Sequence, residues 1–96
     1  MSVNHMVWVR FRPGVDAAAI EAHATALRAL QQRVPGVQSV TVGRNFTDRA
    51  NGYDFGICVI LDDKAALAAY AVHPYHVEVA TALRRDGEIM ALDFEF

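Results

Sequence analysis

The sequence predicts an α+β fold of the ferredoxin-like type, with helices on one face of an antiparallel sheet and the element order β-α-β-β-α-β. Two observations lead to this prediction. Four segments are rich in β-branched and aromatic residues, and two segments between them repeat apolar residues at helical spacing. Proline or aspartate next to glycine marks several boundaries, where the chain turns. The 96 residues are the length of one domain, which we expect to span residues 1–96.

The first expected strand covers residues 3–12, which are rich in β-branched and aromatic types. Alternate residues of a strand share a face, so His5 and Val7 point one way while Met6 and Trp8 point the other. Because both faces carry large apolar side chains, we expect both faces of the sheet to be covered.

The first helix is predicted from about Asp16 to Val34. The Asp16 carboxylate is suited to accept hydrogen bonds from the free amides of the first turn. Pro35 and Gly36 end the helix. The residues that helical spacing places on its inward side are Ile20, His23, Ala24, Leu27, Leu30 and Val34.

Two further strands are predicted at residues 37–44 and 53–61, separated by a loop at 45–52 that ends in an Asn-Gly turn signal. The segment 53–61 is almost wholly apolar. Such a run is typical of a central strand that is covered on both faces.

A second helical region begins after Asp62 or Asp63, either of which is suited to cap it. His73 and Pro74 break this region, because proline disrupts a helix that precedes it. A second segment then runs to about Arg85. The last strand is expected at residues 88–96, with alternation that places four side chains on one face: Met90, Leu92, Phe94 and Phe96.

The face of the sheet that points away from the helices needs a cover of its own. By alternation within their strands, the apolar residues on that face are Met6, Trp8, Cys58 and Ile60. The simplest cover is a second copy of the chain, packed sheet against sheet in a twofold homodimer.

The composition excludes several classes of partner. Nine basic and eleven acidic residues give a net charge of −2, which argues against a nucleic-acid surface and gives no reason for binding an anionic membrane. No apolar stretch approaches the length of a membrane span, and the start of the chain has no signal-peptide pattern. The lone cysteine, Cys58, excludes an internal disulfide. We therefore expect a cytoplasmic protein.

Several short motifs, in this order, resemble the stress-responsive A/B barrel domain family of the dimeric α/β barrel superfamily. They are PGV, GRN, GYD and YxxHPxH, and they lie in matching stretches that cover nearly the whole chain. The resemblance implies a ferredoxin-like monomer and a homodimer whose sheets form a barrel. A few members are polyketide cyclases, in which a tyrosine and the second histidine of HPxH act on the substrate. Those two positions match Tyr70 and His76 here.

The candidate catalytic residues are therefore Tyr70 and His76, together with His5, which alternation places on the helix-facing side of the first strand. Imidazole holds either protonation state near neutral pH and so suits acid–base work. The alternative is structural, because buried polar groups are normally satisfied by hydrogen bonds within the fold. The residues that we expect to line an apolar pocket between helices and sheet are Val7, Val9, Ala24, Leu27, Phe55 and Ile57.

The other polar residues of this region have structural interpretations. His73 and Pro74 make the corner between two helical segments, with a charge on His73 suited to the end of the first. We expect Tyr75 at the surface or at a dimer edge, and His23 at the border of the core. No HExxH pair and no second cysteine are present, so we expect no metal site and no cofactor.

These observations favour a homodimeric stress-responsive A/B barrel protein with a pocket for a small apolar or aromatic ligand. One alternative is a cofactor-independent cyclase or lyase that uses Tyr70 and His76 as an acid–base pair. A second alternative is a cofactor-free monooxygenase from a neighbouring branch of the superfamily.

Overall fold

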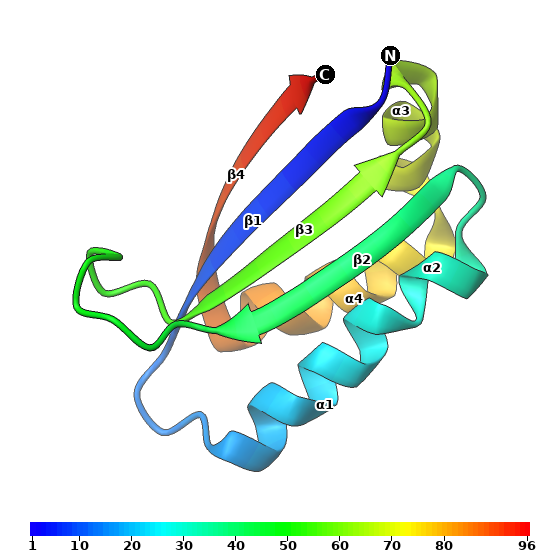
Figure 1. The fold of residues 1–96 in the computed structure, drawn as a ribbon. Coiled ribbons are helices and arrows are strands. Elements are labelled where there is room, and N and C mark those ends of the chain that lie inside the picture. Colours follow the sequence, from blue (N-terminus) through cyan, green and yellow to red (C-terminus); the bar gives the residue numbers. More distant parts are fainter.

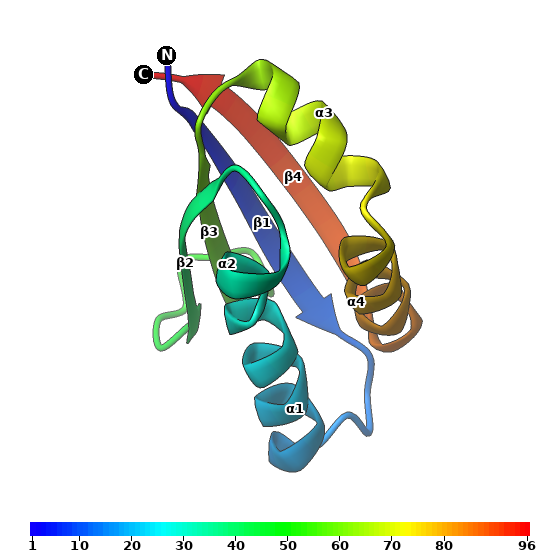
Figure 2. The same cartoon turned by 90° about the vertical axis from the view of Figure 1, so that its right-hand side faces the viewer.

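The computed structural model describes all residues, 1–96, and has the predicted ferredoxin-like architecture (Figure 1). Four antiparallel strands form one sheet in the order β2-β3-β1-β4. The helices all lie on one face of this sheet, as Figure 2 shows. The elements along the chain are β1 (Val3–Phe11), α1 (Ala17–Arg28), α2 (Leu30–Arg33), β2 (Val37–Arg44), β3 (Phe55–Leu61), α3 (Lys64–Val72), α4 (Pro74–Asp86) and β4 (Gly87–Glu95).

Helices α1 and α3 begin at aspartate caps, as the sequence predicts. Asp16 accepts a hydrogen bond from the amide of Ala19 at 2.9 Å, which satisfies a free donor of the first turn of α1. Of the two candidates before α3, Asp63 is the cap, since it accepts from the Ala66 amide at 2.8 Å. Asp62 accepts instead from the Gln38 side chain at 3.0 Å and so ties β2 to the end of β3.

Two boundaries differ from the sequence-based expectation. The first helical region is divided at Ala29, whose ψ of −16° tightens the turn between α1 and α2. The third strand begins at Phe55 instead of residue 53. The reason is the preceding turn, in which the amide of Tyr53 donates to Ala50.

The core lies between the helices and the inward side chains of β1 and β3. Along β3 every second residue is buried, and Val59 and Leu61 are fully enclosed. Val9 of β1 and Leu30 of α2 are equally inaccessible and belong to the same core cluster. Burying each such side chain contributes roughly 1.5–3 kcal/mol, so this layer is the main source of stability.

No helix covers the opposite face of the sheet. The predicted interface residues lie on it, and Trp8 at its centre is 41% exposed. Strand β4 extends this apolar face, because Met90 pairs with Trp8, and Leu92 and Phe94 follow on the same side. These three side chains of β4 are 46%, 60% and 43% exposed.

Candidate functional site

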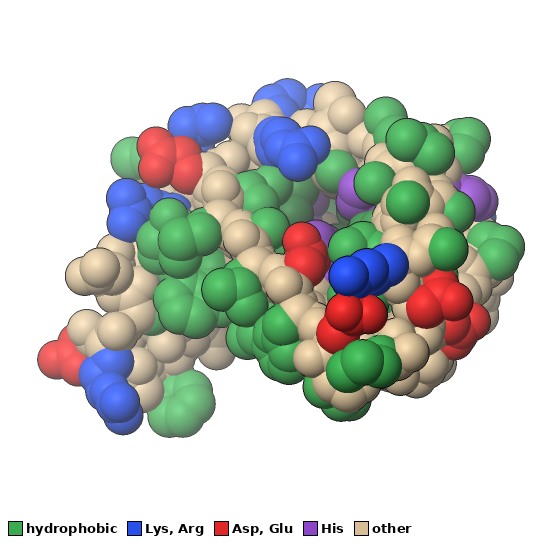
Figure 3. Space-filling view, turned by 90° about the horizontal axis from the view of Figure 1, so that it is seen from above, with side chains coloured by type: hydrophobic (Ala, Val, Ile, Leu, Met, Phe, Trp, Pro, Cys, Tyr) green, Lys and Arg blue, Asp and Glu red, His purple; other side chains and the backbone are tan.

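A cavity of about 740 Å³ separates α3 and α4 from the β1–β4 half of the sheet. Fourteen of the 20 residues that line it are hydrophobic, so its wall is mainly apolar. Seen from above, the molecule is hollowed here, with histidine at the base of the hollow and acidic and basic side chains on its rim (Figure 3). The volume lies within the range typical of small-molecule sites.

Short side chains keep this space open. Ala68 and Ala71 of α3, Ala80 of α4 and Ala91 of β4 all line the cavity. A helix packed closely on a sheet fills the gap between them with large side chains. Four alanines on facing elements leave that gap unfilled.

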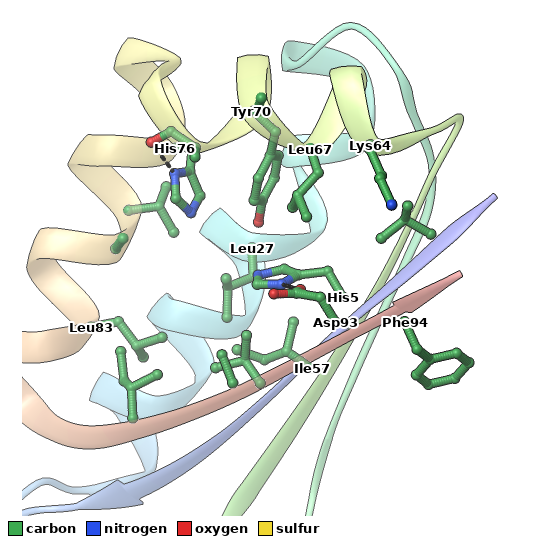
Figure 4. Close-up of a pocket in the computed structure, with 18 of the residues that line it drawn as sticks. His5, Leu27, Ile57, Lys64, Leu67, Tyr70, His76, Leu83, Asp93 and Phe94 are labelled. Carbon is green, nitrogen blue, oxygen red and sulfur yellow. Dashed lines mark hydrogen bonds and ion pairs between the residues drawn. The ribbon is translucent and has the colours of Figure 1, made fainter. Parts of the chain in front are cut away.

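The polar groups of the cavity gather in its middle. His5 on β1 lies directly opposite Asp93 on β4, and its Nδ1 donates a hydrogen bond to the Asp93 carboxylate. This bond fixes the orientation of the His5 ring. The Tyr70 hydroxyl group points toward the pair from the helical layer (Figure 4).

Tyr70 stands between the two histidines. Its ring lies 4.1 Å from the His76 ring and 5.6 Å, edge to face, from the His5 ring, measured between centroids. The Tyr70 side chain is buried at 3% exposure. Burial, and then the negative charge of Asp93, raise the pKa of Tyr70 well above its usual range, so the phenol stays protonated and remains a hydrogen-bond donor.

His76 presents its free nitrogen to the cavity. Its Nδ1 lies 3.2 Å from the carbonyl oxygen of Ala71. Because a carbonyl oxygen only accepts, Nδ1 carries the hydrogen, and Nε2 of the neutral ring is left as a base. Burial lowers the pKa of His76, and the nearby Arg84 guanidinium adds to this effect, while the Ala71 hydrogen bond opposes it. Figure 4 shows the ring directed into the cavity.

The fold and this cluster can now be compared with known proteins. The family model of the stress-responsive A/B barrel domain matches residues 3–96. The chain belongs to this family.

Three known proteins are similar to this chain. An uncharacterized protein of Streptomyces coelicolor is 30% identical over 96 residues, which cover 98% of this chain and 99% of that protein. A crystal structure of a dimeric ferredoxin-like protein of unknown function from Jannaschia sp. CCS1 is 27% identical with a TM-score of 0.87, and all of both chains is covered. A hydroxynitrile lyase from Passiflora edulis is 19% identical with a TM-score of 0.90, covering 97% of this chain and 91% of the lyase, and so has the same fold.

In this A/B barrel domain, the structure brings the three predicted catalytic candidates, Tyr70, His76 and His5, into one cluster. The residues predicted for the pocket divide into two groups. The three that line the cavity are Val7, Leu27 and Ile57. The three that lie in the core instead are Val9, Ala24 and Phe55.

The expectation for the second group is corrected for a simple reason. Val9 and Phe55 are paired with each other in β1 and β3, and the Phe55 ring packs edge to face on Phe11. Ala24 belongs to the same buried cluster. The cavity forms only where α3 and α4 stand away from the sheet, and these residues lie outside that region.

Asp93 is the member of the polar cluster that sequence reasoning missed. Alternation places Asp93 on the face of β4 opposite Phe94, but only the register between β1 and β4 sets it against His5. The sequence held one sign of this contact, since His5 lies near the start of the first strand and Asp93 near the end of the last strand. Antiparallel pairing of the first and last strands would have brought the two together.

Tyr75, expected at the surface or at a dimer edge, is half-buried and makes contacts within the chain. Its hydroxyl donates to the Ala26 carbonyl at 2.9 Å, and the Arg33 guanidinium lies 4.6 Å from its ring centroid. Tyr75 therefore joins α4 to the end of the α1 region. His23 likewise has a structural partner, since its Nε2 lies 2.6 Å from the Asp86 carboxylate.

His73 forms the corner, but through an uncharged nitrogen. Its Nδ1 accepts a hydrogen bond from the Tyr75 amide at 3.1 Å and so caps α4, while Pro74 takes the first helical position. Because an accepting nitrogen bears no hydrogen, the His73 ring is neutral in this bond. His73 therefore acts as a cap of α4 and not as a positive charge at the end of α3.

No three His, Cys, Asp or Glu side chains converge in a way that would hold a metal ion. None of the helices combines the length and apolar character that crossing a bilayer requires.

We predict that the His76 imidazole titrates with a midpoint below the ordinary value of about 6.5. The physical cause is the burial of the ring, which favours its neutral form. The measurement is the chemical shift of the imidazole Cε1–H proton against pH by NMR. A midpoint at or above about 6.5 contradicts the environment described here.

The same shift has a consequence for stability. With a lowered pKa in the folded state, the unfolded chain binds more protons just below pH 6.5, so this contribution to stability is complete above about pH 6.5 and is lost as the pH falls through the folded pKa. His76→Gln removes that titration. Denaturant unfolding at pH 7.5 and pH 5 should show a smaller loss of stability in this variant than in the wild type.

Proposed function

We propose that this protein acts as a homodimer that binds a small apolar or aromatic molecule carrying a hydroxyl or carbonyl group. The observation that carries the proposal is the apolar cavity with one polar cluster at its centre. A wall of this kind buries the body of the ligand, and a few placed polar groups orient it.

The cluster offers complementary partners to such a group. The Tyr70 phenol is a donor for a carbonyl or hydroxyl oxygen, and Nε2 of His76 is an acceptor for a hydroxyl hydrogen. Each hydrogen bond contributes about 0.5–1.5 kcal/mol net. Leu27, Ile57 and Leu83 supply the apolar contacts around it.

The uncovered face of the sheet supports the homodimer. Its predicted contact residues, Met6, Trp8, Cys58 and Ile60, are continuous with the exposed apolar side chains of β4. An apolar face of this extent is typical of an interface between subunits. Relatives from Jannaschia sp. CCS1 and Thermobifida fusca, 27% and 25% identical, are described as dimeric. A lone thiol on this face fits the cytoplasm, where cysteines stay reduced.

A second candidate is a cofactor-independent lyase or cyclase that uses the same cluster. The observation that favours it is the pairing of a base, His76 Nε2, with a phenol held in its protonated form, Tyr70. With a hydroxynitrile, His76 would take the hydroxyl proton while Tyr70 donates a hydrogen bond to the same oxygen. The C–CN bond then breaks, the oxygen becomes the carbonyl oxygen of the aldehyde, and cyanide leaves. The hydroxynitrile lyase of Passiflora edulis shares the fold, and at 19% identity the likeness extends to the fold alone.

For ligand binding, we predict that members of a panel of alkylphenols and δ-lactones stabilise the wild type in thermal unfolding. A ligand at 100 times its Kd contributes about 2.7 kcal/mol. His76→Ala should reduce this stabilisation, because it removes the acceptor in the cavity. Val77→Ala changes the next residue of α4, which does not line the cavity, and should respond like the wild type. The proposal would be contradicted if a compound stabilised His76→Ala as much as the wild type. It would also be contradicted if no compound stabilised the wild type.

For the dimer, we predict that Trp8→Glu yields monomers, because it places a charge in the sheet–sheet interface. Light scattering should give the wild type a mass of twice 10.6 kDa and the variant a mass of 10.6 kDa. Val72→Glu is the matched control, since Val72 is 75% exposed on α3 in the helical layer. A wild-type mass of 10.6 kDa by light scattering would contradict the prediction.

For the second candidate, mandelonitrile cleavage, followed through benzaldehyde absorbance, is a direct assay. Tyr70→Phe and His76→Ala should each lower turnover by about 10²–10⁴-fold, the usual contribution of a positioned acid or base. Tyr75→Phe is the control, because its hydroxyl bonds to Ala26 outside the cavity. Absence of turnover in the wild type, or equal turnover in all variants, would leave only the binding function.

A further inference from the structure

Arg84, which is exposed at the edge of the cavity, is a cation without a partner. His76, Ala80 and Arg84 all line the cavity and follow one another at intervals of four residues along α4. Residues at this spacing lie one above the other on the same helix face. Arg84 in the last turn of α4 therefore lies on the same side of the helix as His76.

Every other charged group on the cavity wall is engaged. Lys64 contacts Glu95 at 3.2 Å across the far end of the cavity, and His5 binds Asp93. The Arg84 guanidinium makes no hydrogen bond, ion pair or cation–π contact with the rest of the chain, although its backbone carbonyl accepts from Arg12 at 3.1 Å. An unengaged cation at the edge of an apolar cavity is free to bind an anion.

The acidic residues nearby do not compensate Arg84. Glu88 lies on the face of β4 turned away from the cavity, where it contacts Arg10 at 3.7 Å. Asp86, at the end of α4, is held by His23. The parts of β4 that line the cavity before Asp93 are Ile89 and Ala91, which are apolar. Arg84 itself is one of the residues that line the cavity.

We infer that the cavity selects apolar carboxylic acids, with Arg84 as the residue that binds the carboxylate. This rests on the ligand-binding function proposed above and makes its chemical class specific. The planar guanidinium matches a carboxylate with two parallel hydrogen bonds, which gives it strength and orientation. The apolar chain of the acid would then lie along the wall of β4 from Ile89 toward Glu95, a span of roughly 20 Å.

The test compares octanoate with 1-octanol at pH 7.5 by isothermal titration calorimetry. Both have the same apolar chain, and only octanoate carries a charge. The wild type should bind octanoate about 10-fold more tightly or better, the usual effect of a hydrogen bond to a charged group. Arg84→Gln should remove this preference and leave octanol binding unchanged. Arg85→Gln is the matched control, since Arg85 does not line the cavity and should keep the preference.

Reversing the charge at Arg84 should create affinity for a cationic ligand. A purely structural role of Arg84 would not produce this gain. Arg84→Glu should lose octanoate and bind octylammonium more tightly than the wild type does. Equal binding of octanoate and octanol by the wild type, or a preference that survives in Arg84→Gln, would overturn the inference and leave the ligand-binding function intact. Failure of both compounds to bind the wild type would overturn the inference together with that function.

Discussion

The position of β1 between β3 and β4 is the constraint on which the rest of the molecule depends. Its register with β3 sets Val9 against Phe55 in the core, and its register with β4 sets His5 against Asp93 in the cavity. A slip of one residue would turn every side chain of β1 to the other face. Trp8 would then enter the core, and the polar cluster would lose His5. The buried side of β1 therefore fixes both the stability of the sheet and the chemistry of the cavity.

The corner at His73 and Pro74 completes the cluster from the helical side. On an unbroken helix, residues six apart differ by about 120° around the axis, so Tyr70 and His76 would face different directions. The break between α3 and α4 brings their rings to 4.1 Å. His73 caps the new helix, and the Ala71 carbonyl, left free at the end of α3, holds the His76 ring. The same interruption thus ends one helix, begins another and orients the base.

The extent to which the sequence determines these features differs from residue to residue. The fold class follows from local patterns, because alternation and helical spacing are properties of each segment alone. The inward direction of Tyr70, His76 and His5 could be predicted for the same reason. Asp93 could not be assigned as the partner of His5. The two residues are 88 positions apart in the sequence, and their contact depends on the pairing of the first and last strands. Val9, Ala24 and Phe55 share the inward pattern of the cavity residues. Which inward residues lie in the core and which line the cavity depends on where α3 and α4 lie relative to the sheet. The bonds of Tyr75 likewise depend on how α4 lies against α1.

Trp8 is the only tryptophan of the chain, and it lies on the uncovered face of the sheet. Its ring meets Tyr53 edge to face at 6.1 Å, and the residue is 41% exposed. Indole fluorescence shifts to longer wavelengths in water and to shorter wavelengths in an apolar environment. The emission wavelength of Trp8 therefore reports whether this face of the sheet is exposed to water or covered. It can be measured in dilute solution without a label.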